Sequence, residues 1–164
     1  MVLTNTTGTI AFNGALITPT LTTATQGYNL SLNATGTIIT NAVSFLNTGA
    51  LTLGKADGTG TQTYTGGLTT TSVGGVVTVN GTLNSSNPIS FGAVTLGSAT
   101  AIASSGIGAL GNLSFSSTVT GANTLSTTTT GATTFSGAIG TTTPLTGLTI
   151  STGSLTAGAI TLVL

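Results

Sequence analysis

The fold of this chain follows from one stretch, Ser90-Phe91-Gly92-Ala93-Val94-Thr95-Leu96-Gly97, which has a near copy upstream. In that copy, Ser44-Phe45 is followed by Gly49-Ala50-Leu51-Thr52-Leu53-Gly54. Each copy ends on an apolar–hydroxyl–apolar triplet closed by glycine. Because side chains alternate across a β-strand, such a triplet puts two apolar groups on one face and a hydroxyl on the other. The two copies predict short strands with one buried face.

Comparable triplets recur along the whole chain. They are Ile10-Ala11-Phe12, Leu30-Ser31-Leu32, Val43-Ser44-Phe45, Leu51-Thr52-Leu53, Val77-Thr78-Val79, Ile89-Ser90-Phe91, Val94-Thr95-Leu96, Leu113-Ser114-Phe115, Leu148-Thr149-Ile150 and Ile160-Thr161-Leu162. Good helix formers such as Glu, Lys, Gln and Arg are almost absent, whereas Thr, about a quarter of the residues, suits strands. Gly, Asn and Ser between the triplets are typical of turns. The chain is therefore expected to be all-β.

A second motif and the aromatic residues indicate a period. The motif is an aromatic residue, any residue, Gly, then Ala or Gly, then Leu or Ile, and it occurs at residues 12–16, 64–68 and 135–139. The aromatic residues at positions 45, 64, 91, 115 and 135 lie 19 to 27 positions apart. Periods of about 20–50 residues are typical of repeat architectures. This spacing predicts a parallel β-helix (β-solenoid) of roughly 20 residues per coil, with about seven or eight coils in a rod roughly 35 Å long.

In such a rod the inward apolar residues of successive coils stack into one core, which a single coil could not bury alone. The residues predicted to stack in this core are Phe12, Leu32, Phe45, Leu53, Val79, Phe91, Leu96, Phe115, Phe135 and Ile150. Residues 1–164 are interpreted as a single solenoid segment, and the unchanged composition at both termini suggests a piece excised from a longer repetitive protein.

A resemblance to a known family covers nearly the whole chain. The stretch Gly131-Ala132-Thr133-Thr134-Phe135-Ser136-Gly137-Ala138-Ile139-Gly140, followed by Thr143-Pro144-Leu145-Thr146-Gly147-Leu148-Thr149-Ile150, resembles the β-strand repeats of giant bacterial surface proteins. These belong with filamentous-haemagglutinin-like and autotransporter-type adhesins. The resemblance implies a right-handed parallel β-helix, export through an outer-membrane transporter and a location on the cell surface.

The charge count limits the chemistry. Lys55 is the single basic residue, Asp57 is the single acidic residue, and the chain has no His, Cys or Trp. General acid–base catalysis, nucleophilic catalysis and metal binding all need titratable or ligating side chains in greater number. Nucleic-acid binding needs clusters of Lys and Arg. We therefore expect a non-catalytic protein with no cofactor, no metal and no nucleic-acid partner. No apolar run approaches the length of a membrane helix, so the chain is not expected to span a membrane.

Two local motifs have plain structural interpretations. Residues 106–111 match a dinucleotide-binding glycine pattern, but no helix is predicted after them and no acidic residue follows, so a glycine-rich turn is favoured. The segment Gly54-Lys55-Ala56-Asp57-Gly58 contains both charges and a turn-forming Asp-Gly pair, which predicts a solvated loop. A calcium site there would need more carboxylates.

Threonine runs form the most distinctive surface feature. Alternate Thr residues on a strand put their hydroxyls on one face. The candidates for an outward Thr ladder are Thr61, Thr63, Thr65, Thr118 and Thr120. Stacked on a flat face, they would resemble the arrays of ice-binding solenoids, but their uneven spacing favours a simple strand-surface role for Thr.

The predicted function is that of a structural or adhesive module of a bacterial cell-surface or secreted protein. Two alternatives stay open: an ice-binding solenoid that uses outward Thr ladders, and a self-assembling extracellular filament subunit. The filament alternative draws support from the net charge of zero, since uncharged proteins tend to associate. The expected partners are neighbouring coils or identical chains end to end, and a host or abiotic surface. The expected location is extracellular.

Overall fold

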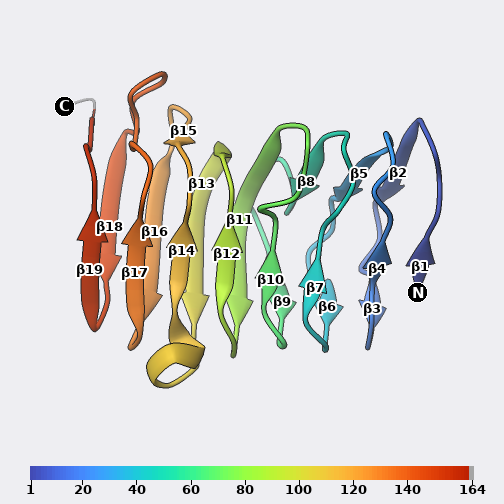
Figure 1. Cartoon of the computed structure of the whole chain (residues 1–164), viewed down its shortest axis with the longest axis horizontal. Helices are drawn as coiled ribbons and strands as arrows, with labels where there is room; N and C mark the ends of the chain where they lie inside the picture. The colour runs from blue at the N-terminus through green and yellow to red at the C-terminus, as the bar shows by residue number, and fades with distance from the viewer. Residues whose placement is uncertain (163–164) are drawn as a thin grey trace.

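The chain winds into a β-solenoid. The computed structural model describes residues 1–162, so the last two residues of the expected 1–164 segment, Val163 and Leu164, lie outside the described residues. About seven turns of about 21 residues each stack along one axis, and the paired strands run parallel. In Figure 1 the nearer strands run upward and the farther strands downward as the chain advances from right to left, which is a right-handed winding. The prediction of an all-β solenoid is confirmed.

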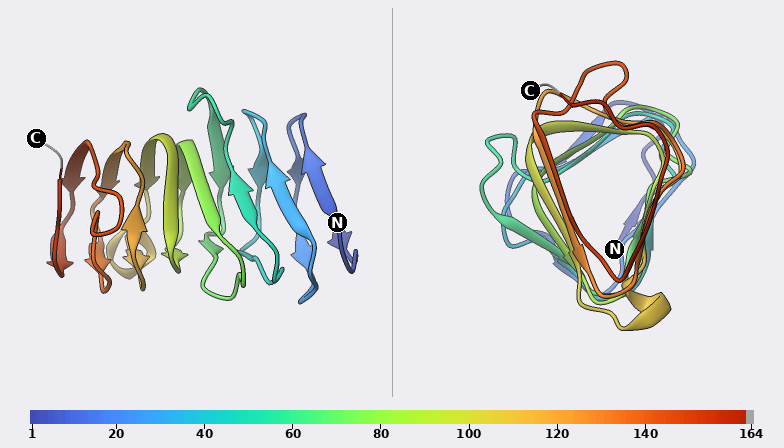
Figure 2. Two further views of the ribbon diagram at one scale, coloured as in Figure 1. Left: turned by 90° about the horizontal axis from the view of Figure 1, so that it is seen from above. Right: turned by 90° about the vertical axis from the view of Figure 1, so that its left-hand side faces the viewer.

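Each turn contributes strands to three faces, which enclose a triangular cross-section seen end-on in Figure 2. The first face contains β2 (Thr9–Phe12), β5 (Asn29–Leu32), β8 (Leu51–Leu53) and β15 (Val119–Thr120), with residues 77–79 of β11 (Val77–Ser85) and residues 94–96 of β13 (Val94–Ser104). The second face contains β3 (Ile17–Thr18), β6 (Ile38–Ile39), β9 (Thr61–Tyr64), β16 (Thr124–Thr129) and β18 (Gly147–Ser151), with residues 81–85 of β11 and 100–104 of β13. The third face contains β1 (Val2–Leu3), β4 (Thr22–Thr23), β7 (Val43–Ser44), β10 (Leu68–Thr69), β12 (Ile89–Phe91), β14 (Leu113–Phe115), β17 (Ala132–Phe135) and β19 (Ser154–Ala157).

The core consists of columns in which each turn adds one side chain above the last. On the first face one column contains only aliphatic residues: Ile10, Leu30, Leu51, Val77, Val94, Val119, Ile139 and Ile160. Parallel strands pair in register there, so every residue of the column between Ile10 and Ile160 meets an apolar residue above and below. This stacking buries apolar surface that one turn alone would leave in water.

Eight of the ten residues proposed for core stacking are fully buried: Leu32, Phe45, Leu53, Val79, Phe91, Leu96, Phe115 and Phe135. The other two, Phe12 and Ile150, are only partly buried, although both pack against the core. Phe12 lies on β2 and Ile150 on β18, which are the first and last strands of the largest sheet. Each therefore has a neighbouring turn on one side only, and its outer side faces solvent.

The aromatic residues do not form the single series that their spacing suggests. Phe91, Phe115 and Phe135 stack in one column of the third face. Tyr64 instead ends β9 on the second face, and its ring meets Phe45 edge-on at a centroid distance of 6.4 Å. The position between Phe45 and Phe91 in this column is occupied by the buried Thr70, which directly follows β10. The regular interval thus mixes two faces.

Turns differ in length because loops project from the corners. Leu51 and Val77 occupy one column although 26 positions separate them, whereas Val77 and Val94 are 17 positions apart. In the longer turn, residues 54–60 form a corner loop. A second projection holds the short 3-10 helix η1 (Gly108–Gly111), which protrudes from a corner of the triangle in Figure 2.

Candidate functional surface

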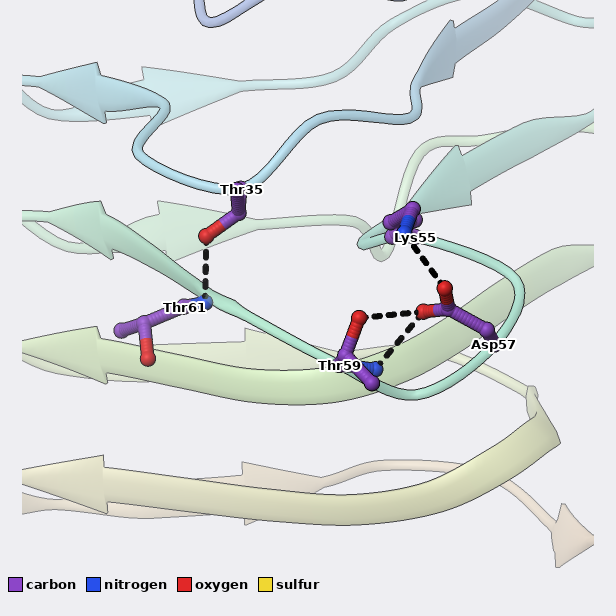
Figure 3. Close-up of polar contacts among 5 residues, drawn as sticks. All are labelled: Thr35, Lys55, Asp57, Thr59 and Thr61. Atoms are coloured by element: carbon purple, nitrogen blue, oxygen red, sulfur yellow. Dashed lines mark hydrogen bonds and ion pairs between the residues drawn. The ribbon is translucent and has the colours of Figure 1, made fainter.

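The two charged side chains lie together on the corner loop of the third turn. The Lys55 ammonium pairs with the Asp57 carboxylate, which also accepts hydrogen bonds from the Thr59 hydroxyl (2.6 Å) and the Thr59 backbone N–H (2.9 Å) (Figure 3). Hydrogen bonds from Lys55 first, and then from Thr59, lower the pKa of Asp57 to about 2. This loop is exposed, as the sequence predicts. Its carboxylate is already engaged by its own neighbours, which accounts for the ionised Asp57 without any ligand.

The glycine pattern at residues 106–111 forms a corner between the second and third faces. Gly108–Gly111 is a four-residue 3-10 helix that leads into β14, so the strand-to-helix geometry of a dinucleotide site is not formed there. The projection exposes Ile107 by 84%. The predicted turn interpretation agrees with this geometry.

Tyr64 is fully buried, and its hydroxyl is hydrogen-bonded inside the core. The Tyr64 hydroxyl donates to Gln62 Oε1 at 2.8 Å, and Gln62 Nε2 donates to the carbonyl oxygens of Leu32 (2.7 Å) and Ala34 (2.9 Å). Burial raises the pKa of the Tyr64 phenol well above its ordinary value. Because these polar groups satisfy one another inside the solenoid, they stabilise the fold and present no group to solvent.

The five Thr residues proposed for a surface ladder lie on two different faces. Thr61 and Thr63 project outward from β9 on the second face, and Thr65 directly follows β9. Thr118 and Thr120, in contrast, belong to the first face. In the column of Thr63 the neighbours are Ile38 and Asn84, so hydroxyls do not follow one another there. The proposed set therefore does not form one array. Alternation along a strand places hydroxyls on a face, but only stacking between turns makes a ladder.

The stacking creates a different hydroxyl ladder, on the outer surface of the third face. We call it the third-face hydroxyl column, and its members are Ser44, Thr69, Ser90, Ser114, Thr134 and Thr156. Every one of these six consecutive turns contributes a hydroxyl, and the Ser114 Oγ donates to Ser90 Oγ at 3.0 Å. Neighbouring parallel strands lie about 4.7–4.9 Å apart, which sets the spacing of the hydroxyls along the rod.

A second hydroxyl ladder follows the outer surface of the first face. This first-face hydroxyl column consists of Ser31, Thr52, Thr78, Thr95 and Thr120. A shallow depression of about 370 Å³ lies beside it, lined by backbone and small side chains that include Val76, Ala93 and Thr118. Of the residues proposed for a Thr ladder, Thr120 therefore belongs to the first-face hydroxyl column. The signal that could have found both columns is the central residue of each apolar–hydroxyl–apolar triplet.

The two columns define the chemistry that the surface offers. Hydroxyls donate and accept hydrogen bonds, but they become nucleophiles only beside a base. Within residues 1–162, no group of three or more His, Cys, Asp or Glu side chains is close enough to hold a metal ion, and no helix is long and apolar enough to cross a membrane.

Comparison of the chain with protein-family models, with curated proteins and with solved structures finds no match.

Proposed function

We propose that this chain is a non-catalytic structural module of a bacterial surface protein, in which the solenoid acts as a stiff, uncharged spacer with an adhesive outer face. The observation that carries the proposal is the aliphatic column of the first face, which continues without interruption from Ile10 to Ile160, so that each added turn lengthens the rod. The outer surface adds two long hydroxyl columns that can hydrogen-bond to neutral polar surfaces.

The location can be tested with an epitope in the corner loop at residues 55–60. This loop is exposed and lies outside the strands, so an insertion there leaves the stacked columns intact. The tagged protein is expressed in the bacterium that encodes it, and intact cells are compared with permeabilised cells by antibody labelling. Equal labelling of intact and permeabilised cells is expected. Labelling only after permeabilisation would contradict a surface location.

Adhesion is tested separately with beads coated with the purified chain. The coated beads are expected to bind neutral hydroxylated surfaces, and the binding is expected to be insensitive to salt because Lys55 and Asp57 are the only charged side chains. A double variant, Ser90→Ala with Ser114→Ala, removes the centre of the third-face hydroxyl column and should reduce retention. Unchanged retention by this variant would contradict a role for that column in adhesion.

The third-face hydroxyl column favours a second candidate function, which is ice binding. Six consecutive turns present hydroxyls at a constant spacing on a rigid scaffold, and such a lattice can order water. The test is a measurement of thermal hysteresis. We expect Ser90→Lys with Ser114→Lys to abolish it, whereas Thr78→Lys with Thr95→Lys on the first face should leave it intact. Absence of hysteresis in the unmodified protein would eliminate this function.

A further inference from the structure

We propose that copies of this chain associate head to tail, so that β1 and β2 of one copy pair in parallel with β19 and Ile160 of the preceding copy. The inference goes beyond the spacer function above and rests only on the solenoid architecture, not on the cellular location. It deepens the filament alternative by naming the strands, their register and the two contact surfaces.

The first observation is that, among residues 1–162, each end of the solenoid presents one singly paired strand per face. At the N-terminal end β1 pairs with β4, β2 pairs with β5 and β3 pairs with β6, each on one side only. At the C-terminal end β18 and β19 are likewise the last strands of their sheets, and Ile160 bridges only to Ile139. The outer backbone groups of such edge strands are free to template a further parallel strand.

The apolar interior is also uncovered at the ends, in the same columns. Leu155 is 49% exposed and Ile160 is 44% exposed, although Leu113 and Ile139 in their columns are fully buried. At the other end Ile10 and Phe12 are only partly buried. An added turn would remove these side chains from water, which is the dominant favourable term in association.

The open strands of the two ends match on the first and third faces. The outward column of the third face begins with Val2 beside Thr22 and ends with Thr156, so Val2 of the next copy follows Thr156. On the first face Ile10 of the next copy follows Ile160. On the second face β3 does not reach β18, because Ile160 begins a further turn after β18 and β19, and within residues 1–162 that turn has no second-face strand. The junction therefore pairs the first and third faces and leaves one position of the second face unfilled.

Size and charge favour a second copy as the partner. A partner must present two parallel edges that follow the same triangular outline, and the opposite end of this chain has them. One turn contributes about 21 residues, which falls within the roughly 20–30 residues per side of a standard stable interface. The ion pair of Lys55 and Asp57 lies on an internal turn, so like charges do not oppose each other at the junction.

Cysteine cross-linking tests the register, since the chain has no cysteine of its own. Val2 and Thr156 are exposed at opposite ends of the third face and become neighbours only across a head-to-tail junction. A V2C/T156C variant treated with a short bis-maleimide should give a ladder of covalent multimers. The matched control, V2C/T149C, has its second cysteine on the second face and should give few. Equal ladders from both variants, or none from V2C/T156C, would overturn the proposal.

A charge at the open interior tests the contact itself. Leu155→Lys can be solvated in a single rod but would bury an unpaired ammonium at the junction, so association should weaken by roughly tenfold or more. Thr156→Lys places the same charge one residue away on the outer surface and should leave association much less affected. The readouts are sedimentation velocity over a range of concentrations and electron microscopy, where the unmodified chain should form filaments one rod wide.

Circular dichroism and small-angle scattering of the same samples separate this inference from the spacer function. Rods that stay single at high concentration would overturn head-to-tail association and leave the spacer function standing. A chain without β-structure, or without a rod shape, would overturn both. Filaments that persist unchanged in Leu155→Lys would show a different contact and would also overturn the proposed junction.

Discussion

Phe115 and Phe135 stack face to face inside the third face, with ring centroids 4.6 Å apart and 11° between the ring planes. Phe91 continues the stack at 5.3 Å from Phe115. Each ring comes from a different turn, so this stack joins three turns through one column of the core. Loss of the central Phe115 ring should therefore remove the stacking contacts of both Phe91 and Phe135.

Phe115→Ala is therefore expected to destabilise the chain by about 3–5 kcal/mol, since it deletes a fully buried ring and leaves a cavity between two others. The measurement is denaturant unfolding followed by circular dichroism. Ser114→Ala is the control, because Ser114 is the outward neighbour on the same strand and should change stability by less than about 0.5 kcal/mol. Comparable effects from both variants would show that the inward and outward faces had been assigned wrongly.

Thr133→Val should stabilise the chain by roughly 1 kcal/mol. The Thr133 hydroxyl is buried, and within residues 1–162 it has no hydrogen-bond partner. Its neighbours in the column, Leu113 and Leu155, are apolar and offer none. Replacing the hydroxyl by a methyl of similar size removes an unsatisfied polar group from the core. Thermal melting checks this, with the outward Thr134→Val as control. A lower melting temperature for Thr133→Val would mean that the hydroxyl is satisfied.

Gly54→Ala and Gly8→Ala should differ sharply although both glycines have a similar positive φ, +84° and +86°. A Cβ at Gly54 would lie against the Asn80 carbonyl oxygen of the next turn, whereas among the described residues nothing comes within 4 Å of a Cβ at Gly8. Gly8→Ala should cost about 1–2 kcal/mol from its left-handed backbone alone. Gly54→Ala should cost clearly more, because two turns must separate. Equal shifts in the denaturation midpoint would show that the positive backbone angle alone accounts for the loss of stability in both variants.

Acid pH should lower the stability of the folded chain slightly, through the protonation of Asp57. The pKa of Asp57 is held at about 2 in the folded chain, below the ordinary value of 3.8, by Lys55 and Thr59. A carboxylate whose pKa is lowered by folding stabilises the folded chain at pH values above its pKa in the unfolded chain. This stabilisation is lost as the pH falls through its pKa in the folded chain. The melting temperature should therefore decline slightly between about pH 4 and pH 2. Asp57→Asn should remove that decline, and an identical acid profile for the variant would contradict the assignment.

Alkaline pH should act through Tyr64, whose pKa is raised by burial. The stability that this raised pKa contributes is fully present below the pKa of tyrosine in the unfolded chain, which is near 10. It is lost as the pH rises beyond that value. Above about pH 10 this residue should lower stability by up to about 1.4 kcal/mol per pH unit. Melting temperatures between pH 9 and 11.5 should fall less steeply for Tyr64→Phe. Parallel slopes for both proteins would mean that Tyr64 ionises without unfolding.

The parts of the fold that depend on local alternation could be predicted from the sequence. The triplet Leu113-Ser114-Phe115 places Leu113 and Phe115 in the core and Ser114 outside, as its order requires. The motif of an aromatic residue followed by glycine is less specific. It ends a strand on the first face at Phe12, on the second at Tyr64 and on the third at Phe135. It therefore marks a corner of the coil without saying which corner.

By itself, the sequence determined an all-β chain, short strands with one apolar face, a period near 20 residues and a near absence of titratable side chains. Only the tertiary structure decided which strand stacks on which. Corner loops add or remove residues without disturbing the register, so residues as unequally spaced as Leu51, Val77 and Val94 share one column. The hydroxyl columns and the matching ends arise from that register, because contact between turns depends on position along the rod and not on distance along the chain.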